Sequence, residues 1–329
     1  MHLRSFRHAA ALLSLLALTS QALPQQASAP LASSRALLES GKIPAAEQQL
    51  RSWLQAHPDS ADGHFLLGYA LFREQRAADS LAEFTLGAKF RRPSTGDFKV
   101  IAADYVLLGD FTDAARWLTV AAQQEPSNPD TWYLLARAQY NENRFADAIT
   151  SFQRVLALEP RSVRAENNLG LCYQGLQQNA AAKAAYQTAI VWQQDAAAQP
   201  DKAAVPQQKT AQPHPSAQPY LNLGSILLDE EQSAQAFPLL KQAAALAPDN
   251  PKAHEQLGRA YEALHQYSAA QAEYERAIAL APRASGLHFK LGQIYRREGL
   301  SQQAQQQFDQ CAKLNSTHSS IETPNPPSH

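Results

Sequence analysis

The feature that most constrains this chain is a period of 34 residues that runs through most of its length. Rows of 34 that start at positions 27, 61, 95, 129 and 163 align Leu67, Ile101, Leu135 and Leu169 in one column. After an insertion of 20 residues (223 − 169 = 54 = 34 + 20), rows starting at 217, 251 and 285 continue the column with Leu223, Leu257 and Leu291. Such a period predicts an array of stacked supersecondary units.

Each row reads as two facing helices. Row positions 4, 7, 8 and 11 follow the i, i+3, i+4, i+7 spacing of one helical face. Position 20 is small in every row: Ala46, Ser80, Ala114, Ala148, Ala182, Ala236, Ala270 and Ala304. Position 24 is large and apolar: Leu50, Phe84, Leu118, Phe152, Tyr186, Leu240, Tyr274 and Phe308. Glycines at position 15 and prolines at position 32 predict where the first helix turns and the second stops.

These columns resemble the tetratricopeptide repeat (TPR) over roughly residues 30–318. One row carries most of the pattern: Trp132, Leu135, Ala136, Phe145, Ala148, Phe152 and Pro160. The resemblance implies an all-α fold, an α-solenoid of stacked antiparallel helix pairs, with about seven full units and a partial N-terminal unit. It also implies that the first helix of each pair lines a concave face on which such proteins bind other proteins or peptides.

Departures from the pattern divide the chain into segments. We expect a signal peptide over 1–22, a partial N-terminal unit or cap over 23–60, and repeat units over 61–196 and 217–318. The segment 197–216 is rich in Pro, Gln and Ala, which predicts an inserted loop. The polar, proline-rich segment 319–329 predicts a disordered tail. Because Gln194 occupies the proline column, the second helix of row 163–196 is expected to run past Trp192.

The N-terminal residues have the pattern of an export signal. Arg4 and Arg7 precede an apolar stretch, Ala9 to Leu18, and Ser20-Gln21-Ala22 supplies small residues at the cleavage position. We therefore expect cleavage after Ala22 and an exported protein, either secreted or periplasmic if the source is a Gram-negative bacterium. An uncleaved anchor is the alternative. The rest of the sequence contains no stretch that predicts a transmembrane segment.

Charge and cysteine content narrow the classes of partner. The formal net charge is −1, from 29 basic and 30 acidic residues scattered along the chain, so no basic stripe is available for a nucleic acid. Cys172 and Cys311 are the only cysteines and fall in well-separated units, which predicts two core thiols and no disulfide.

Catalytic signatures are absent from the sequence. His254-Glu255 begins like the H-E-x-x-H zinc motif, but Gly258 stands where the second histidine belongs. His64, His254 and His288 all occupy row position 4, a packing position, and are interpreted as structural. Neither a phosphate-binding glycine loop nor a nucleophile elbow is present. We therefore expect no enzyme, no cofactor and no metal.

A second stripe beside the packing stripe, at row positions 2, 5, 6, 9, 12 and 13, predicts a peptide-binding groove. Aromatic residues would take apolar side chains, while Asn and Arg would bind backbone groups and acids. The candidate binding residues are Phe65, Tyr69, Arg73, Lys99, Tyr133, Arg137, Asn141, Asn167, Asn168, Asn222, Arg259 and Lys290. The stripe also carries Val106, Leu107 and Leu134. A clamp for a C-terminal carboxylate is not supported, because Ala103 and Leu134 replace its asparagines.

The sequence favours a non-catalytic scaffold or adaptor that binds an unidentified protein or peptide in an exported compartment. Two alternatives stay open. The array could be a structural spacer that self-assembles into a homo-oligomer, or an accessory subunit of an envelope enzyme or secretion complex that makes contact through residues 197–216.

Overall fold

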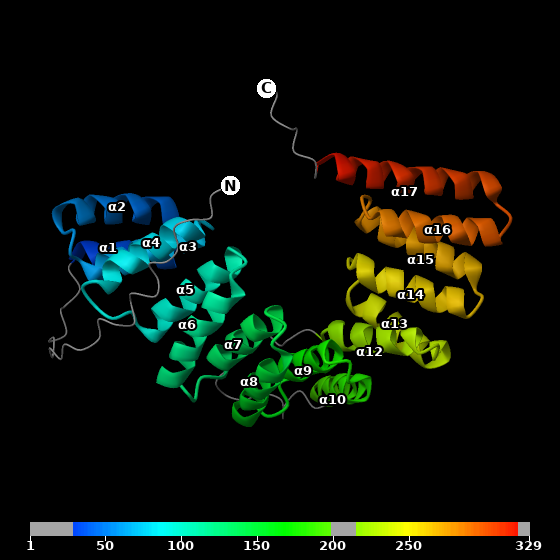
Figure 1. Cartoon of the computed structure of the whole chain (residues 1–329), viewed down its shortest axis with the longest axis horizontal. Helices are drawn as coiled ribbons and strands as arrows, with labels where there is room; N and C mark the ends of the chain where they lie inside the picture. Colours follow the sequence, from blue (N-terminus) through cyan, green and yellow to red (C-terminus); the bar gives the residue numbers. More distant parts are fainter. Residues whose placement is uncertain (1–28, 199–214, 322–329) are drawn as a thin grey trace, which may run out of the picture. The chain divides into compact units, whose positions relative to one another are not determined.

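The computed structural model describes residues 29–198 and 215–321, which form sixteen α-helices and no strand (Figure 1). The predicted signal peptide and its cleavage point lie outside these residues, as does most of the 197–216 insertion. The chain divides into two compact units, one ending at Pro160 and the other beginning at Arg161. We call them the N-terminal and C-terminal units and describe each by itself.

Four antiparallel helix pairs make up the described part of the N-terminal unit. They are α1 (Ala29–Glu39) with α2 (Ile43–Ala56), α3 (Ala61–Arg73) with α4 (Ala77–Ala88), α5 (Thr95–Leu107) with α6 (Phe111–Gln124), and α7 (Pro129–Asn141) with α8 (Phe145–Leu158). Successive pairs stack in chain order, since α2 packs on α3, α4 on α5 and α6 on α7 (Figure 1). The first helix of the partial N-terminal repeat has 11 residues, against 13 in the next three repeats.

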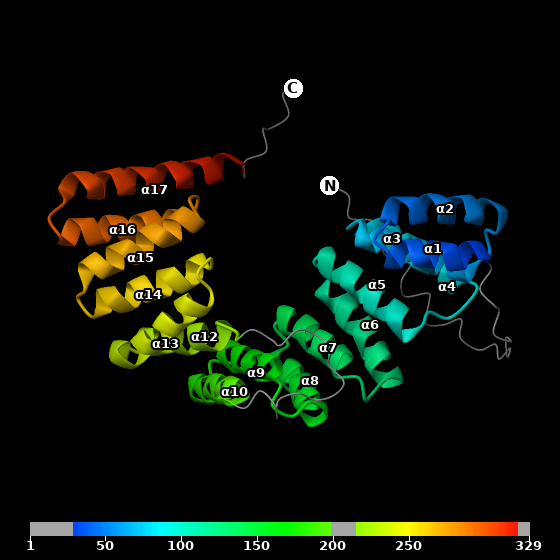
Figure 2. The ribbon, with the colours of Figure 1, turned by 180° about the vertical axis from the view of Figure 1, so that it is seen from behind.

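The C-terminal unit repeats the same arrangement. Its pairs are α9 (Val163–Gly175) with α10 (Asn179–Ala198), α12 (Gln218–Asp229) with α13 (Ser233–Leu246), α14 (Pro251–Ala263) with α15 (Tyr267–Leu280), and α16 (Ser285–Arg297) with α17 (Ser301–Ile321). These pairs also stack in chain order, as the reverse view shows (Figure 2). Within residues 29–198 and 215–321, none of the helices combines the length and apolar character that a membrane span requires.

Local sequence explains where these helices begin. Ser94 accepts a hydrogen bond from the backbone N–H of Asp97, and the Asp97 carboxylate accepts one from the backbone N–H of Ser94, forming a capping box at the start of α5. Asn128 and Asn250 cap α7 and α14, each followed by a proline at the first helical position. A proline fits there because the missing N–H would have no partner within the helix.

Every first helix is followed, at row position 15, by a residue with left-handed backbone. Gly41, Gly109 and Gly299 adopt φ of 76°, 75° and 80°. The other five repeats carry a non-glycine residue at this position with φ between 59° and 62°: Gln75, Asn143, Gln177, Glu231 and His265. The repeat geometry therefore requires the tight turn. The turn is retained even where the residue at position 15 has a Cβ atom, which a left-handed backbone disfavours.

The two core columns predicted from the sequence are confirmed. The row-position 20 residues are between 0% and 3% exposed, and seven of the eight large residues at position 24 are buried to the same degree. At Gly68, Gly224 and Gly258, an added Cβ would lie 2.6–2.9 Å from the position 24 side chain of the facing helix. The small residue at position 8 is therefore required for the close approach of the two helices.

Two helices continue beyond the predicted segment boundaries. Helix α10 has 20 residues and reaches Ala198, two residues into the predicted 197–216 loop. Ser216 is tied back to it, because its N–H donates to Gln193 Oε1 at 2.7 Å and its carbonyl accepts from Gln193 Nε2 at 3.2 Å. Helix α17 reaches Ile321, so the first three residues of the predicted tail, 319–321, are helical instead of disordered.

Candidate functional site

The surface of interest is formed by the first helices of successive pairs. Helix α1 lies against α3, α3 against α5 and α12 against α14, whereas successive second helices of the described residues are not in comparable contact. Closer spacing on one side curves a stack of helix pairs toward that side. We use the term first-helix face for the side chains at row positions 2, 5, 6, 9, 12 and 13, taken separately in each unit.

In the N-terminal unit, the predicted residues of α3 form a small cation–aromatic group. Arg73 is exposed, and its Nη1 donates a hydrogen bond to the hydroxyl of Tyr69 at 3.2 Å. Its guanidinium carbon lies 5.8 Å from the centre of the Tyr69 ring, within reach of a cation–π interaction. Tyr69 is half-buried and its ring also contacts that of Phe72, at 6.4 Å between centres.

Helices α5 and α7 present the remaining predicted residues of this unit. Lys99 is half-buried, with Nζ 3.5 Å from Glu125. The half-buried ring of Tyr133 packs edge-on against Phe152, at 5.6 Å between centres. Arg137 and Asn141 are exposed, and neither has a hydrogen-bond or ion-pair partner within the described part of the chain.

In this unit, the prediction for Phe65 is wrong. Phe65 was predicted to line the groove, but it is only 4% exposed and stacks on Phe84 at 5.9 Å between ring centres. The guanidinium of Arg91 covers its ring at 5.0 Å. The absence of a side chain at Gly87 explains the position, because an added Cβ would lie 2.5 Å from the Phe65 ring. Phe65 therefore belongs to the core.

The most exposed apolar side chains of this face are ones that the candidate binding residues did not include. Val106 and Leu107 at the end of α5 are 40% and 52% exposed, and Leu134 on α7 is 40% exposed. The sequence placed all three in the stripe. Their exposure could not be inferred from it, because one repeat earlier the row position of Val106 holds the half-buried Phe72 and that of Leu134 holds the half-buried Val100.

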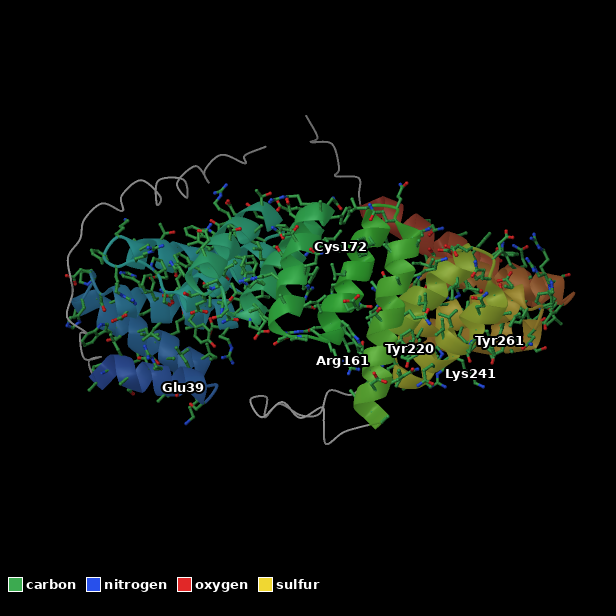
Figure 3. The ribbon with its side chains drawn as sticks, turned by 90° about the horizontal axis from the view of Figure 1, so that it is seen from below. Glu39, Arg161, Cys172, Tyr220, Lys241 and Tyr261 are labelled. Atoms are coloured by element: carbon green, nitrogen blue, oxygen red, sulfur yellow. The ribbon has the colours of Figure 1, made fainter. Side chains whose placement is uncertain are left out.

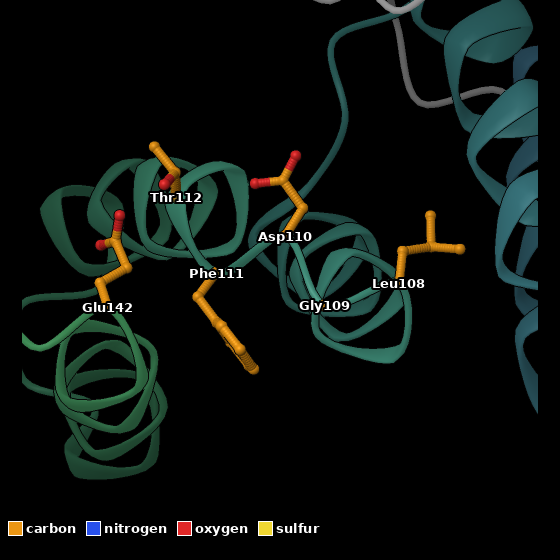
Figure 4. A pocket seen from close by; sticks show the side chains of 6 residues that line it. All are labelled: Leu108, Gly109, Asp110, Phe111, Thr112 and Glu142. Atoms are coloured by element: carbon orange, nitrogen blue, oxygen red, sulfur yellow. The ribbon is translucent and has the colours of Figure 1, made fainter. Parts of the chain in front are cut away.

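A hollow of about 450 Å³ adjoins this region, between the α5–α6 turn and the end of α7 (Figure 4). Its lining residues are Leu108, Gly109, Asp110, Phe111, Thr112 and Glu142. Both carboxylates have structural partners: Asp110 accepts from the backbone N–H of Asp113 at 3.0 Å, and Glu142 pairs with Arg144 at 3.1 Å. Neither acid of the hollow is therefore free of a structural partner.

In the C-terminal unit, the predicted asparagines mostly bind one another. The prediction that Asn167 lines the groove is also wrong, since Asn167 is only 6% exposed and its Oδ1 accepts a hydrogen bond from Asn222 Nδ2 at 3.0 Å. The Oδ1 of Asn222 accepts from Gln218 at 2.8 Å, and Asn168 donates to the backbone carbonyl of Arg164 at 2.7 Å. The bond between Asn167 and Asn222 joins α9 to α12, whereas the other two bonds lie within α12 and within α9. Asn167 is therefore structural.

The predicted cations of the C-terminal unit are also engaged. Arg259 pairs with Asp229 at 2.8 Å and donates to Gln256 at the same distance. Lys290 pairs with Glu255 at 2.9 Å. Both ion pairs join a first helix to the first helix of the preceding repeat.

The groups that could carry chemistry have structural roles. His64, His254 and His288 are buried, and each contacts the proline carbonyl six residues earlier, at 2.9–3.1 Å, and the side chain 19 residues later, at 2.6–2.7 Å. Burial raises the pKa of the Cys172 thiol to about 12, which keeps it unreactive (Figure 3). Within the described residues no three His, Cys, Asp or Glu side chains cluster as metal ligands would.

The stacked helix pairs and their first-helix face define the class of protein: an α-solenoid of repeated antiparallel pairs. Two family models described as tetratricopeptide repeat match the chain, one at residues 31–97, 133–203 and 255–316, the other at 105–151 and 227–282. These matches cover more than half of the sequence. The chain belongs to the tetratricopeptide repeat family.

No curated protein matches the chain. Among solved structures, it is similar to PilW, titled a widely conserved type IV pilus biogenesis factor, with a TM-score of 0.53 and 21% identity over 65% of this chain and 90% of that one. It is also similar to the APC/C hetero-tetramer Cut9-Hcn1, with a TM-score of 0.55 and 15% identity over 87% of this chain and 52% of that one. At these identities the similarity establishes the fold.

Proposed function

We propose that the chain is a non-catalytic scaffold that binds a segment of another protein through the first-helix face of its N-terminal unit. The observation that carries this proposal is the exposure of Val106 and Leu107 on α5 and of Leu134 on α7, together with Arg137 and Asn141 of α7, which have no partner within the described residues. The tetratricopeptide repeat family supports protein binding as the general role.

The energetics of apolar burial support this surface. Covering each of these half-exposed aliphatic side chains would contribute on the order of 1 kcal/mol. Leu134 and Arg137 are three residues apart on α7, and Arg137 and Asn141 are four apart, so all three side chains share one side of that helix. An extended or helical segment lying across α5 and α7 would therefore meet apolar, cationic and amide groups together.

We further propose that binding takes place in an exported compartment. The support is the sequence of residues 1–22, with Arg4 and Arg7 before an apolar stretch and small residues up to Ala22. N-terminal sequencing of the protein from its native cells should give Leu23 as the first residue. A chain that retains Met1 would contradict cleavage.

Site-specific photo-crosslinking tests the binding surface. A photoreactive amino acid at position 134 should give a covalent adduct in native cells, whereas the same amino acid at position 86 should not. Leu86 is a suitable control because it lies on the second helix α4 of the same unit and is 37% exposed. Equal yields at the two positions, or none at 134, would contradict the proposal. An adduct with the mass of two copies of this chain would indicate self-assembly instead.

A further inference from the structure

Resting on the proposed function, we infer that the partner segment is acidic as well as apolar, and that only the first-helix face of the N-terminal unit takes it. The inference comes from a difference in how the two units neutralise the cations on their first helices. Both faces are built from the same row positions, so they can be compared cation by cation.

The C-terminal unit pairs its cations internally. Arg259, Lys290 and Arg297 contact carboxylates of the preceding first helix at 2.8, 2.9 and 3.3 Å. Lys252 pairs with Glu255 at 3.1 Å within α14, and the Arg296 guanidinium lies 5.9 Å from the ring centre of Phe308. An acidic ligand would have to displace these partners.

The pKa of Glu255 reports the same internal pairing. Burial acts to raise this pKa, but hydrogen bonds from Lys290 and Lys252 outweigh it, and the pKa is lowered overall. The carboxylate therefore stays ionised between these two amines. The acidic and basic side chains on this part of the face therefore neutralise one another.

On α3 and α7 of the N-terminal unit, neither arginine is paired with a carboxylate of the described residues. Arg137 has no partner within the described residues, and Arg73 bonds only to the hydroxyl of Tyr69. Lys99 has a contact with Glu125, at 3.5 Å. The arginines of α3 and α7 are therefore available to a ligand. On α1 the unpaired Arg35 is accompanied by the unpaired Glu39, so α1 adds no net charge.

The acids of the same three helices are already bonded. Asp62 pairs with Arg91 at 2.7 Å, and Asp97 accepts from the backbone N–H of Ser94 at 2.7 Å. Asp104 is fully buried, and Asp130 has an interaction of its own. With the acids engaged and the arginines free, the face carries positive charge around exposed aliphatic side chains. Guanidinium groups bind carboxylates through paired, charge-assisted hydrogen bonds, which selects acidic side chains.

Phage display of random 12-residue peptides on the mature chain tests the inference. Selection should enrich peptides in which Asp or Glu alternates with apolar residues, and these should not bind a Leu107→Ser/Leu134→Ser variant. Binding of the most enriched peptide, measured by fluorescence polarisation, should weaken roughly three- to fivefold in Arg137→Gln, as expected for a partly exposed ion pair. It should also weaken with added salt.

Arg154→Gln is the matched control, because Arg154 lies exposed on the second helix α8 of the same unit and its loss changes the net charge equally. Its affinity should equal that of the wild type, as should that of Arg259→Gln in the C-terminal unit. Enrichment of basic or uncharged peptides, or equal losses in Arg137→Gln and Arg154→Gln, would overturn the acidic partner and leave the binding surface standing. If no selected peptide depends on Leu107 and Leu134, the binding surface itself is wrong.

Discussion

Replacing Asp104 by asparagine should remove a pH dependence of stability that originates in the core of the N-terminal unit. Asp104 is completely buried on α5, and its Oδ2 lies 2.6 Å from the Ser80 hydroxyl oxygen. That oxygen is also 2.8 Å from the carbonyl of Gly68. One hydroxyl has one proton and cannot donate to both acceptors. The three groups are satisfied together only when the Asp104 carboxyl is protonated, donates to Ser80, and Ser80 donates to Gly68.

The magnitude follows from the shift in pKa. Burial raises the pKa of Asp104 from 3.8 to about 7, against a smaller lowering by the Ser80 hydrogen bond, and no charged group contributes noticeably. A folded-state pKa above the unfolded value means that the native state holds the proton longer. The stability that protonated Asp104 contributes is then fully present below about pH 4 and is lost as the pH rises to about 7. A difference of about 3 units corresponds to at most about 4 kcal/mol.

Urea unfolding of the mature chain between pH 4.5 and 8, followed by tryptophan fluorescence, measures this effect. The difference in unfolding free energy between Asp104→Asn and wild type should be smallest at pH 4.5 and should grow in favour of the variant up to pH 7, because the amide can donate to Ser80 without ionising. Titration of other carboxylates cancels in the difference. Asp147→Asn on the exposed side of α8 is the control and should show no such trend. A flat difference for Asp104→Asn would refute the protonated carboxyl.

Two further predictions concern the repeat geometry. Gly258→Ala should destabilise the C-terminal unit by roughly 1–3 kcal/mol, because the new Cβ would lie 2.8 Å from the buried Tyr274 ring. Gly286→Ala on α16 is the control and should be neutral or stabilising by up to about 1 kcal/mol, because no atom lies within 4 Å of its new Cβ. Thermal unfolding measures both changes, and equal effects would contradict the packing argument. Gln177→Gly should stabilise the protein by roughly 0.5–1 kcal/mol, because Gln177 adopts a φ of 59°. Gly109→Ala, at a φ of 75°, should destabilise it by about 1 kcal/mol or more. Urea unfolding measures the two changes, and the same sign for both would contradict the backbone strain inferred for this turn.

The helix pairs were predictable because the same residue types recur at the same row positions in every repeat. A single small residue such as Ala148 says little, but a small residue at position 20 and a large residue at position 24 of the same helix, repeated in eight rows, identify the packed side of the second helix. The left-handed turn was only partly visible, since glycine marks it in three repeats. Its presence at Gln75 and Glu231 follows from the period alone.

The binding surface was less predictable for physical reasons. The stripe identifies a side of each helix, but the depth of a side chain depends on its neighbour in the facing helix, as Gly87 decides for Phe65. The charge of the surface depends on pairs such as Lys290 with Glu255 and Arg297 with Glu262, which lie one repeat apart. The 34-residue spacing does not tell which cations find such a partner.

Hydrogen–deuterium exchange of the mature chain, with and without the selected acidic peptide, tests the binding role of the first-helix face most directly. Binding should slow exchange in α5 and α7, and to a smaller extent in α3, while α14 and α16 exchange as in the free protein. Protection confined to the second helices α4, α6 and α8, or to residues 163–316, would contradict the assignment of the binding surface to this face.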